Sequence, residues 1–193
     1  MEITEAIYHR RAVRRYTAAE VTPAMLMPLL DAAVQAPSPL NMQPWSFAIF
    51  CGRERLAGFS RRIKEHLIHT LPPLFELHEH TDRMNDPNYD VFHGAPALIV
   101  ICAKPEGYGP EESCGLVAQN LMLAAHAAGL GTCPLGFVRT WLRLPQVKDE
   151  LGISAGHHPT FPLVIGHPAG KPSPVSRRKP DVVVWAQSPA GPT

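Results

Sequence analysis

Apolar residues recur along this chain with the three-to-four residue spacing of helices packed on a core. Thr22 followed by Pro23 is typical of a helix N-terminus, and Pro37 ends that helix near Ala36 because its ring forbids continuation. Gly129 lies where a left-handed C-terminal cap is expected. The pattern predicts helices at 2–9, 23–36, 53–69, 111–128 and, capped by Thr140, 140–151.

Shorter apolar runs predict strands. The run at 96–103 is continuous and rich in β-branched residues, which is typical of a strand buried on both faces, so we expect it at the centre of the sheet. Further strands are predicted at 45–50, 131–138, 160–166 and 181–185.

Helices and strands mix without strict alternation, which favours an α+β fold over a doubly wound one. Nothing separates two domains, so we expect residues 1–193 to form one domain. Residues 71–94 lack a clean period and are interpreted as a lid or surface excursion, and 186–193 as a flexible tail. The proline-rich C-terminal segment is too extended to build a core, which favours its lying across a second subunit.

Composition limits the classes of function. The 193 residues have 18 basic and 17 acidic side chains, a formal net charge of +1, so the chain is no general polyanion binder and we expect no nucleic-acid partner. The start lacks a signal peptide pattern and no apolar stretch is long enough to span a bilayer. With widely spaced cysteines and no C-x-x-C pair, this predicts a cytoplasmic protein without a membrane or metal partner.

Against that neutral background, Arg10, Arg11, Arg14 and Arg15 fall within six positions. Such local charge predicts a small anionic ligand, and a solvated surface cluster remains the alternative. The glycines of 129–136 do not form a dinucleotide loop, because Pro134 stands where the last glycine is needed. No phosphate-binding P-loop or serine-hydrolase motif occurs, and the paired histidines at 66/69, 78/80 and 157/158 lack partners at metal-ligand spacing.

Four segments in order, "RRAVRRY" at 10–16, "APSPLNMQPWSF" at 36–47, "AQNLMLAAHAAGLGTCPLGF" at 118–137 and "RRKP" at 177–180, resemble the motifs of the nitroreductase family of flavin mononucleotide (FMN) enzymes. The resemblance extends from residue 2 to about 185. It implies a nitroreductase-like fold, with a central mixed sheet flanked by helices, in a homodimer with an extended C-terminal segment.

The resemblance also implies the cofactor site. Planar guanidinium groups suit the FMN phosphate. The implied phosphate contacts are Arg10, Arg11, Ala12, Arg14 and Arg178, and Arg15 has no matched role. The implied flavin-edge contacts are Pro37, Ser38, Pro39, Asn41, Gln43, Pro134, Leu135 and Gly136. Of the last three, only Leu135 and Gly136 have an amide hydrogen to donate to the flavin.

The implied activity is reduction of electron-poor acceptors such as nitroaromatics or quinones with NADH or NADPH, by ping-pong hydride transfer through FMN. Because the cofactor carries the chemistry, no catalytic side chain is assigned. A reductive dehalogenase, a flavin-consuming synthase and a flavin-binding protein without turnover remain alternatives. Two residues depart from the family pattern: Ala12 replaces a usual serine and Ser113 a common aspartate. The first removes a hydroxyl contact to the phosphate, and the second can alter a helix N-terminus or dimer contacts.

Overall fold

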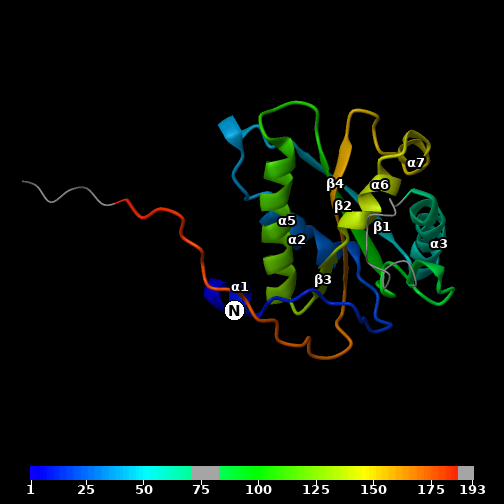
Figure 1. Cartoon of the computed structure of the whole chain (residues 1–193), viewed down its shortest axis with the longest axis horizontal. Helices are drawn as coiled ribbons and strands as arrows, with labels where there is room; N and C mark the ends of the chain where they lie inside the picture. Colours follow the sequence, from blue (N-terminus) through cyan, green and yellow to red (C-terminus); the bar gives the residue numbers. More distant parts are fainter. Residues whose placement is uncertain (71–82, 187–193) are drawn as a thin grey trace, which may run out of the picture.

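A computed structural model describes residues 1–70 and 83–186 and shows a four-stranded sheet between two groups of helices (Figure 1). The strands are β1 (Trp45–Cys51), β2 (Ala97–Ala103), β3 (Gly131–Pro134) and β4 (His158–Gly166), in the order β1-β2-β4-β3. The helices are α1 (Ile3–His9), α2 (Pro23–Ala33), α3 (Arg53–Thr70), α5 (Pro110–Ala127), α6 (Arg139–Leu142) and α7 (Pro145–Glu150), with 3-10 turns η1 (Pro39–Asn41) and η2 (Gly136–Val138).

Strand β2 is buried along its whole length and is an interior strand, as its apolar run predicts. Its alternate side chains enter two cores, because successive residues of a strand point to opposite faces. Ile99 and Ile101 pack with α2 and α5, whereas Leu98 and Val100 pack with α3, α6 and α7. The α+β prediction is confirmed.

Helix α5 ends as the sequence predicts, with Gly129 just beyond it in the left-handed conformation at φ 76°. Most of its apolar residues are buried, but Leu116 is 48% exposed. Ile3, Ile7 and Tyr8 of α1 are exposed as well. One face of the chain therefore leaves apolar side chains of both helices in solvent.

Two sequence predictions change in detail. Among the described residues the ladders between the strands are antiparallel, and parallel pairing is limited to an isolated bridge between Ala12 and Thr132. The helix predicted from Thr140 to Leu151 is two helices, with Thr140 inside α6 rather than capping it. Pro145 begins α7, where its missing N–H and fixed φ are tolerated, so the chain restarts the helix there.

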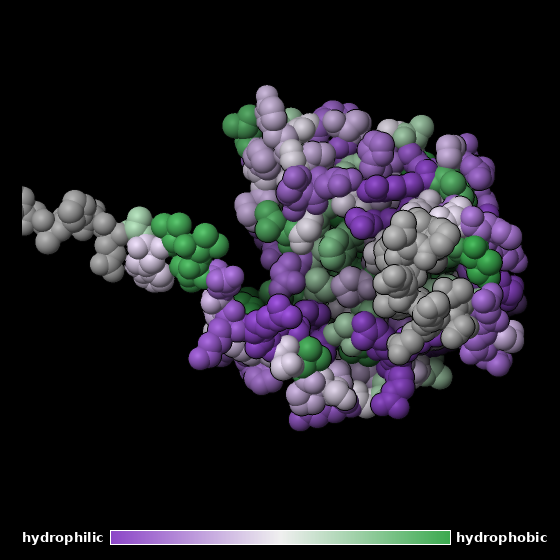
Figure 2. All heavy atoms as spheres, in the orientation of Figure 1, coloured by the Kyte–Doolittle hydropathy of each residue, from purple (hydrophilic) through white to green (hydrophobic). Residues whose placement is uncertain are grey.

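The C-terminal prediction of a strand at 181–185 is wrong for the single chain. These residues carry no strand and extend away from the body, with Val183 90% and Trp185 77% exposed (Figures 1 and 2). A strand requires a hydrogen-bonded neighbour, which this segment lacks within the described residues. Of the predicted lid at 71–94, residues 71–82 lie outside the described residues. Of the predicted tail at 186–193, the structure describes Ala186 alone. No described helix combines the length and apolarity needed to cross a bilayer.

Candidate functional site

The arginine segment, residues 10–17, runs in extended form along the outer edge of β3. Val13 N–H donates to the Thr132 carbonyl at 2.9 Å. On its other side lies the C-terminal strap, residues 167–175, where Ala169 N–H donates to the Arg15 carbonyl and Thr17 N–H to the His167 carbonyl, both at 2.9 Å. The first and last parts of the chain thus meet at one edge of the sheet.

Close packing sets the distance between the arginine segment and β3. A Cβ built on Gly131 would lie 2.6 Å from Cγ2 of Val13, far inside van der Waals contact. Glycine at 131 therefore lets Val13 pack directly on the strand backbone. The distance between the arginine segment and β3 depends on this contact.

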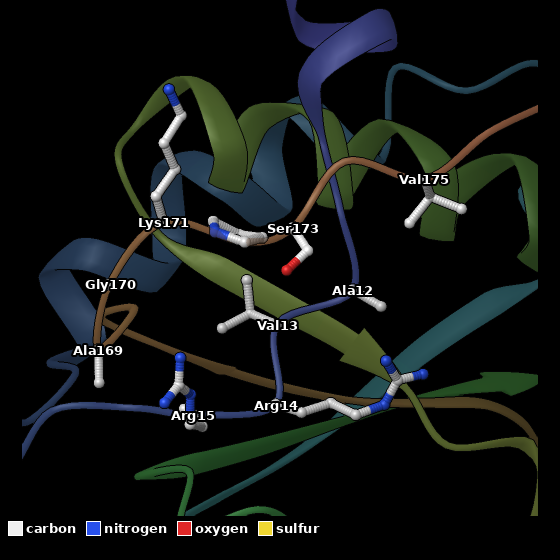
Figure 3. Close-up of a pocket in the computed structure, with 10 residues that line it drawn as sticks. Ala12, Val13, Arg14, Arg15, Ala169, Gly170, Lys171, Ser173 and Val175 are labelled. Carbon is white, nitrogen blue, oxygen red and sulfur yellow. The ribbon is translucent and has the colours of Figure 1, made fainter.

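The four arginine side chains of the segment have different surroundings. Burial raises the pKa of the Cys133 thiol and the charges of Arg14 and Arg10 lower it, which places both guanidinium groups near this thiol. Figure 3 shows Arg14 reaching toward the C-terminal end of β3, while Arg15 lies on the other side beside Ala169. Arg11 instead donates to the carbonyls of Tyr8 and Arg10, each at 2.8 Å.

No described carboxylate forms an ion pair with the positive charge of this segment. Burial, followed by the charges of Arg11 and Arg177, lowers the pKa of Arg10. The three ion pairs of the described chain involve Arg53, Arg62 and Arg143 and no residue of the arginine segment. Like charges kept together without a carboxylate repel one another, and an anion bound among them would relieve that repulsion.

Arg178, the predicted C-terminal phosphate contact, belongs to the exposed stretch after the strap. Its neighbour Arg177 is the residue whose charge reaches Arg10. This places Arg177 near the arginine segment, while the described residues show no hydrogen bond or ion pair of Arg178, whose phosphate contact stays a prediction.

Two hollows border the arginine segment. One of 260 Å³ is lined by Ala12, Val13, Arg14, Arg15 and the strap (Figure 3). The other, of 780 Å³, is bounded by Arg10, Arg11, α1, the turn at 129–132 and the strap. Both offer arginine side chains to a ligand beside the sheet edge.

The turn after β3 holds the next predicted contacts. Pro134 ends the strand, and Leu135 N–H donates to the Pro162 carbonyl of β4 at 2.9 Å. That corrects the expectation of two donors, because the Leu135 amide belongs to the sheet. Gly136 N–H has no acceptor among the described residues, and Arg139 Nε donates to the Gly136 carbonyl at 3.1 Å. Gly136 N–H is thus the amide of this turn that no described residue accepts, and its contact with a flavin stays a prediction.

The loop at 37–43 has a strained backbone. Leu40, Asn41 and Gln43 have φ of 50°, 55° and 48°, a left-handed conformation that is costly for leucine in particular. Ser38 Oγ accepts from Gln43 N–H at 2.9 Å, and Asn41 Oδ1 accepts from Gln43 Nε2 at 3.1 Å. Such strain is concentrated at binding sites in proteins, and here it occurs in an exposed loop.

One chain does not bring this loop to the arginine segment. Figure 1 shows η1 at the upper left and residues 10–17 along the bottom, with the sheet between them. Pro37, Ser38, Pro39, Asn41 and Gln43 therefore lie apart from the predicted phosphate contacts. The sequence motifs carried no signal of this separation.

Of the two departures from the family pattern, Ala12 leaves the site without a hydroxyl at its bridge to Thr132. Ser113 is buried in the first turn of α5, and its Oγ donates to the Gly109 carbonyl at 3.0 Å. The described residues contain no cluster of three or more metal-ligating side chains. His78 and His80 lie outside them.

Arg53 supports the site and was missed by sequence reasoning. From the start of α3 its guanidinium donates to the carbonyls of Thr17 and Ala18, at the end of the arginine segment, and to Gly94 O at 3.1 Å. It also forms an ion pair with Glu20 at 2.8 Å. These contacts span about 40 residues of sequence, and no local pattern indicates them.

Comparison with known proteins identifies the family. The sequence profile of the nitroreductase family matches residues 7–167. This chain belongs to the nitroreductase family. A putative NADH dehydrogenase/NAD(P)H nitroreductase of Methanothermobacter thermautotrophicus is 27% identical over 186 residues, covering 94% of this chain and 85% of that protein.

Solved structures confirm the nitroreductase-like fold. A nitroreductase with bound FMN from Desulfitobacterium hafniense superposes with a TM-score of 0.79 at 23% identity, covering 97% of this chain and all of that one. An iodotyrosine deiodinase bound to FMN and 3-iodo-L-tyrosine has a TM-score of 0.73 at 24% identity, covering 96% and 100%. An iodotyrosine deiodinase of Haliscomenobacter hydrossis is 25% identical over 204 residues, covering 91% of this chain and 84% of that protein.

Proposed function

We propose that the protein is an FMN-dependent oxidoreductase that uses NADH or NADPH to reduce small electron-poor acceptors such as nitroaromatics or quinones. The observation that carries the proposal is the charge of Arg10 and Arg14, which no described carboxylate pairs with, beside a turn whose Gly136 amide no described residue accepts. An anion at one end and a hydrogen-bond acceptor at the other is the chemistry of a flavin with a phosphate tail.

In this proposal the residues bind and orient, and none takes or gives a proton. Arg10, Arg14 and Arg178 hold the phosphate, with Ala12 offering only its backbone. Gly136 N–H donates to the reactive edge of the ring, so the ring is fixed against the end of β3. When bound, FMN supplies the hydride transfer between nicotinamide and acceptor.

A homodimer follows from the same proposal. The strained loop at 37–43 and the arginine segment lie at different ends of one chain, so a second copy has to bring its loop to the flavin edge. Exposed apolar side chains on α1, on α5 and at 182–185 support the same arrangement, since a partner would bury them.

The first test is the spectrum of the purified protein. We expect a yellow flavoprotein whose flavin absorption bleaches anaerobically with NADH or NADPH and returns with a nitroaromatic or quinone. Protein that neither carries nor rebinds FMN would contradict the proposal. FMN bound but reduced by neither nicotinamide would indicate a flavin-binding protein without turnover.

The second test separates the site from a surface cluster. Arg14→Ala and Arg178→Ala should lower FMN occupancy, since each removes a charged donor. Arg55→Ala is the matched control, because Arg55 is exposed on α3 and lines neither hollow, and this variant should keep its flavin. Unchanged occupancy in the first two variants would contradict the assignment.

Reductive dehalogenation is a second candidate, favoured by the iodotyrosine deiodinase relatives. Product analysis with nitroaromatic, quinone and halotyrosine acceptors distinguishes the two activities. We also propose a reducing, cytoplasmic setting, since Cys51, Cys102, Cys114 and Cys133 are all free thiols.

A further inference from the structure

Tyr16 lies near the end of the arginine segment, and its side chain folds back onto the segment. Its phenol donates to the Val13 carbonyl at 2.7 Å, across Arg14 and Arg15. The ring is held from outside, because a Cβ built on Gly166 would come within 2.9 Å of Tyr16 Cδ1. Burial raises the pKa of Tyr16 far above its ordinary value, so the hydroxyl remains a donor at every pH of interest.

The carbonyl that Tyr16 holds shares a peptide unit with the Arg14 N–H. In a planar trans peptide these two groups point in opposite directions, so fixing one fixes the other. The Val13 N–H is already bound to Thr132 at 2.9 Å, which holds the preceding peptide unit on β3. The described chain provides no acceptor for the Arg14 N–H.

Arg14 therefore has two donors ready for one ligand, its guanidinium and its backbone amide. Arg14 is one of the residues that line the 260 Å³ hollow between Ala12 and the strap (Figure 3). Ala12 contributes no side-chain donor to this hollow. The Arg14 N–H, two positions after Ala12, can replace the hydrogen bond of the missing serine hydroxyl with similar strength when its peptide is held in place.

We propose that Tyr16 is a positioning residue for flavin binding: its hydroxyl holds the Val13–Arg14 peptide so that the Arg14 N–H and guanidinium both face the FMN phosphate. This inference rests on the proposed function. It predicts that the hydroxyl of Tyr16 contributes to affinity for the phosphate and not to affinity for the ring.

The test compares FMN with riboflavin, which has the same ring and ribityl chain without the phosphate. Flavin-free wild type, Tyr16→Phe and Tyr108→Phe are titrated with each ligand by flavin fluorescence. Tyr16→Phe keeps the buried ring and removes one hydroxyl. Tyr108→Phe is the matched control, since Tyr108 is 71% exposed and no hydrogen bond of its hydroxyl occurs among the described residues.

We expect Tyr16→Phe to raise the Kd for FMN about five- to tenfold and to leave the Kd for riboflavin within about twofold of wild type. Riboflavin binding also shows that the variant is folded. Equal weakening of both ligands would mean a general structural role and would overturn the inference, as would an unchanged Kd for FMN. Wild type that binds neither flavin would overturn the proposed function itself, and this inference with it.

Discussion

The two outer strands of the sheet have different surroundings. The edge of β3 is covered: the arginine segment lies along it, the strap lies beside that segment, and glycine at 131 lets Val13 pack on the strand. The outer edge of β1 has no strand paired with it in the described chain. Near β1 the chain instead displays the strained loop at 37–43, just before Trp45.

This contrast shows what one chain can build alone. The β3 edge holds its arginines by hydrogen bonds that join residues far apart in sequence, so the phosphate half of the proposed site is preformed. The β1 end presents a loop and a strand edge that no other described strand pairs with, and the apolar stretch at 182–185 is exposed among the described residues. Two half-sites at different ends of one chain suit a pair of chains.

The largest expected effect comes from ending the chain after Pro180. This removes the apolar stretch and keeps Arg177 to Lys179. Burying one valine or larger side chain stabilises by about 1.5–3 kcal/mol, so losing four should raise the dimer Kd more than about a hundredfold. Light scattering during size-exclusion chromatography over a dilution series measures it.

The matched control for this truncation ends after Ala186, which removes only residues 187–193 and should dimerise like the full chain. If the shorter chain dimerises as tightly as the control, the apolar stretch does not join the copies, and the contrast between the two edges loses its explanation.

Complementation tests whether each site uses both ends. Arg14→Ala and Asn41→Ala protomers should each bind FMN poorly as homodimers. In a mixed dimer one site receives both defects and the other receives none, so about half of the heterodimer's sites should bind FMN. Differently tagged chains, copurified, allow FMN per heterodimer to be measured.

The control mixture combines Arg10→Ala with Arg14→Ala. Both changes lie in the arginine segment, so every site of that heterodimer keeps one defect. No recovery in the Arg14 and Asn41 mixture would mean that each site belongs to a single chain. Recovery in the control would mean that Arg10 and Arg14 of one chain serve different sites.

The sequence predicted the elements whose signals are local. The β-branched run of β2 predicts a buried strand whichever strands pair with it. Gly129 ends α5 because glycine adopts the left-handed conformation without strain. The arginine cluster likewise predicts an anion site from local charge alone, and this stays a prediction.

Features that depend on distant neighbours were not predictable. The sequence predicts a free donor at Leu135, because it does not show that the Leu135 N–H donates to the Pro162 carbonyl of β4. Val182 to Trp185 have the composition of a strand, but a strand forms only beside another one. The separation of the 37–43 loop from the arginine segment is likewise a property of the whole topology.

Changing Gly131 to alanine should disturb the covered edge alone. The new Cβ would meet Val13 at 2.6 Å, so the arginine segment must move or the core must strain. We expect a loss of about 1–3 kcal/mol in the free energy of unfolding and lower FMN occupancy. Urea unfolding and the flavin-to-protein absorbance ratio measure the two effects.

Gly58→Ala is the matched control for that change, because a Cβ there in α3 meets only the end of Arg61 at 3.9 Å. It should stabilise by about 0.5–1 kcal/mol through helix propensity. A Gly131 variant as stable as this control, with full flavin, would show that the close approach of Val13 is not needed.

The smallest effect compares one thiol on each outer strand. Cys51 ends β1 and is exposed, whereas Cys133 of β3 is buried and its burial raises its pKa, with Arg14 and Arg10 opposing. Because the thiolate is the reactive form, Cys51 should react with Ellman's reagent at least about tenfold faster than Cys133 at about pH 8. Cys51→Ser and Cys133→Ser variants assign the two rates. In the chain ending after Pro180 the Cys51 rate should be no slower than in the full chain, because no described residue of the removed stretch pairs with β1. Equal rates for the two thiols would show that the β3 edge opens as freely as the β1 edge.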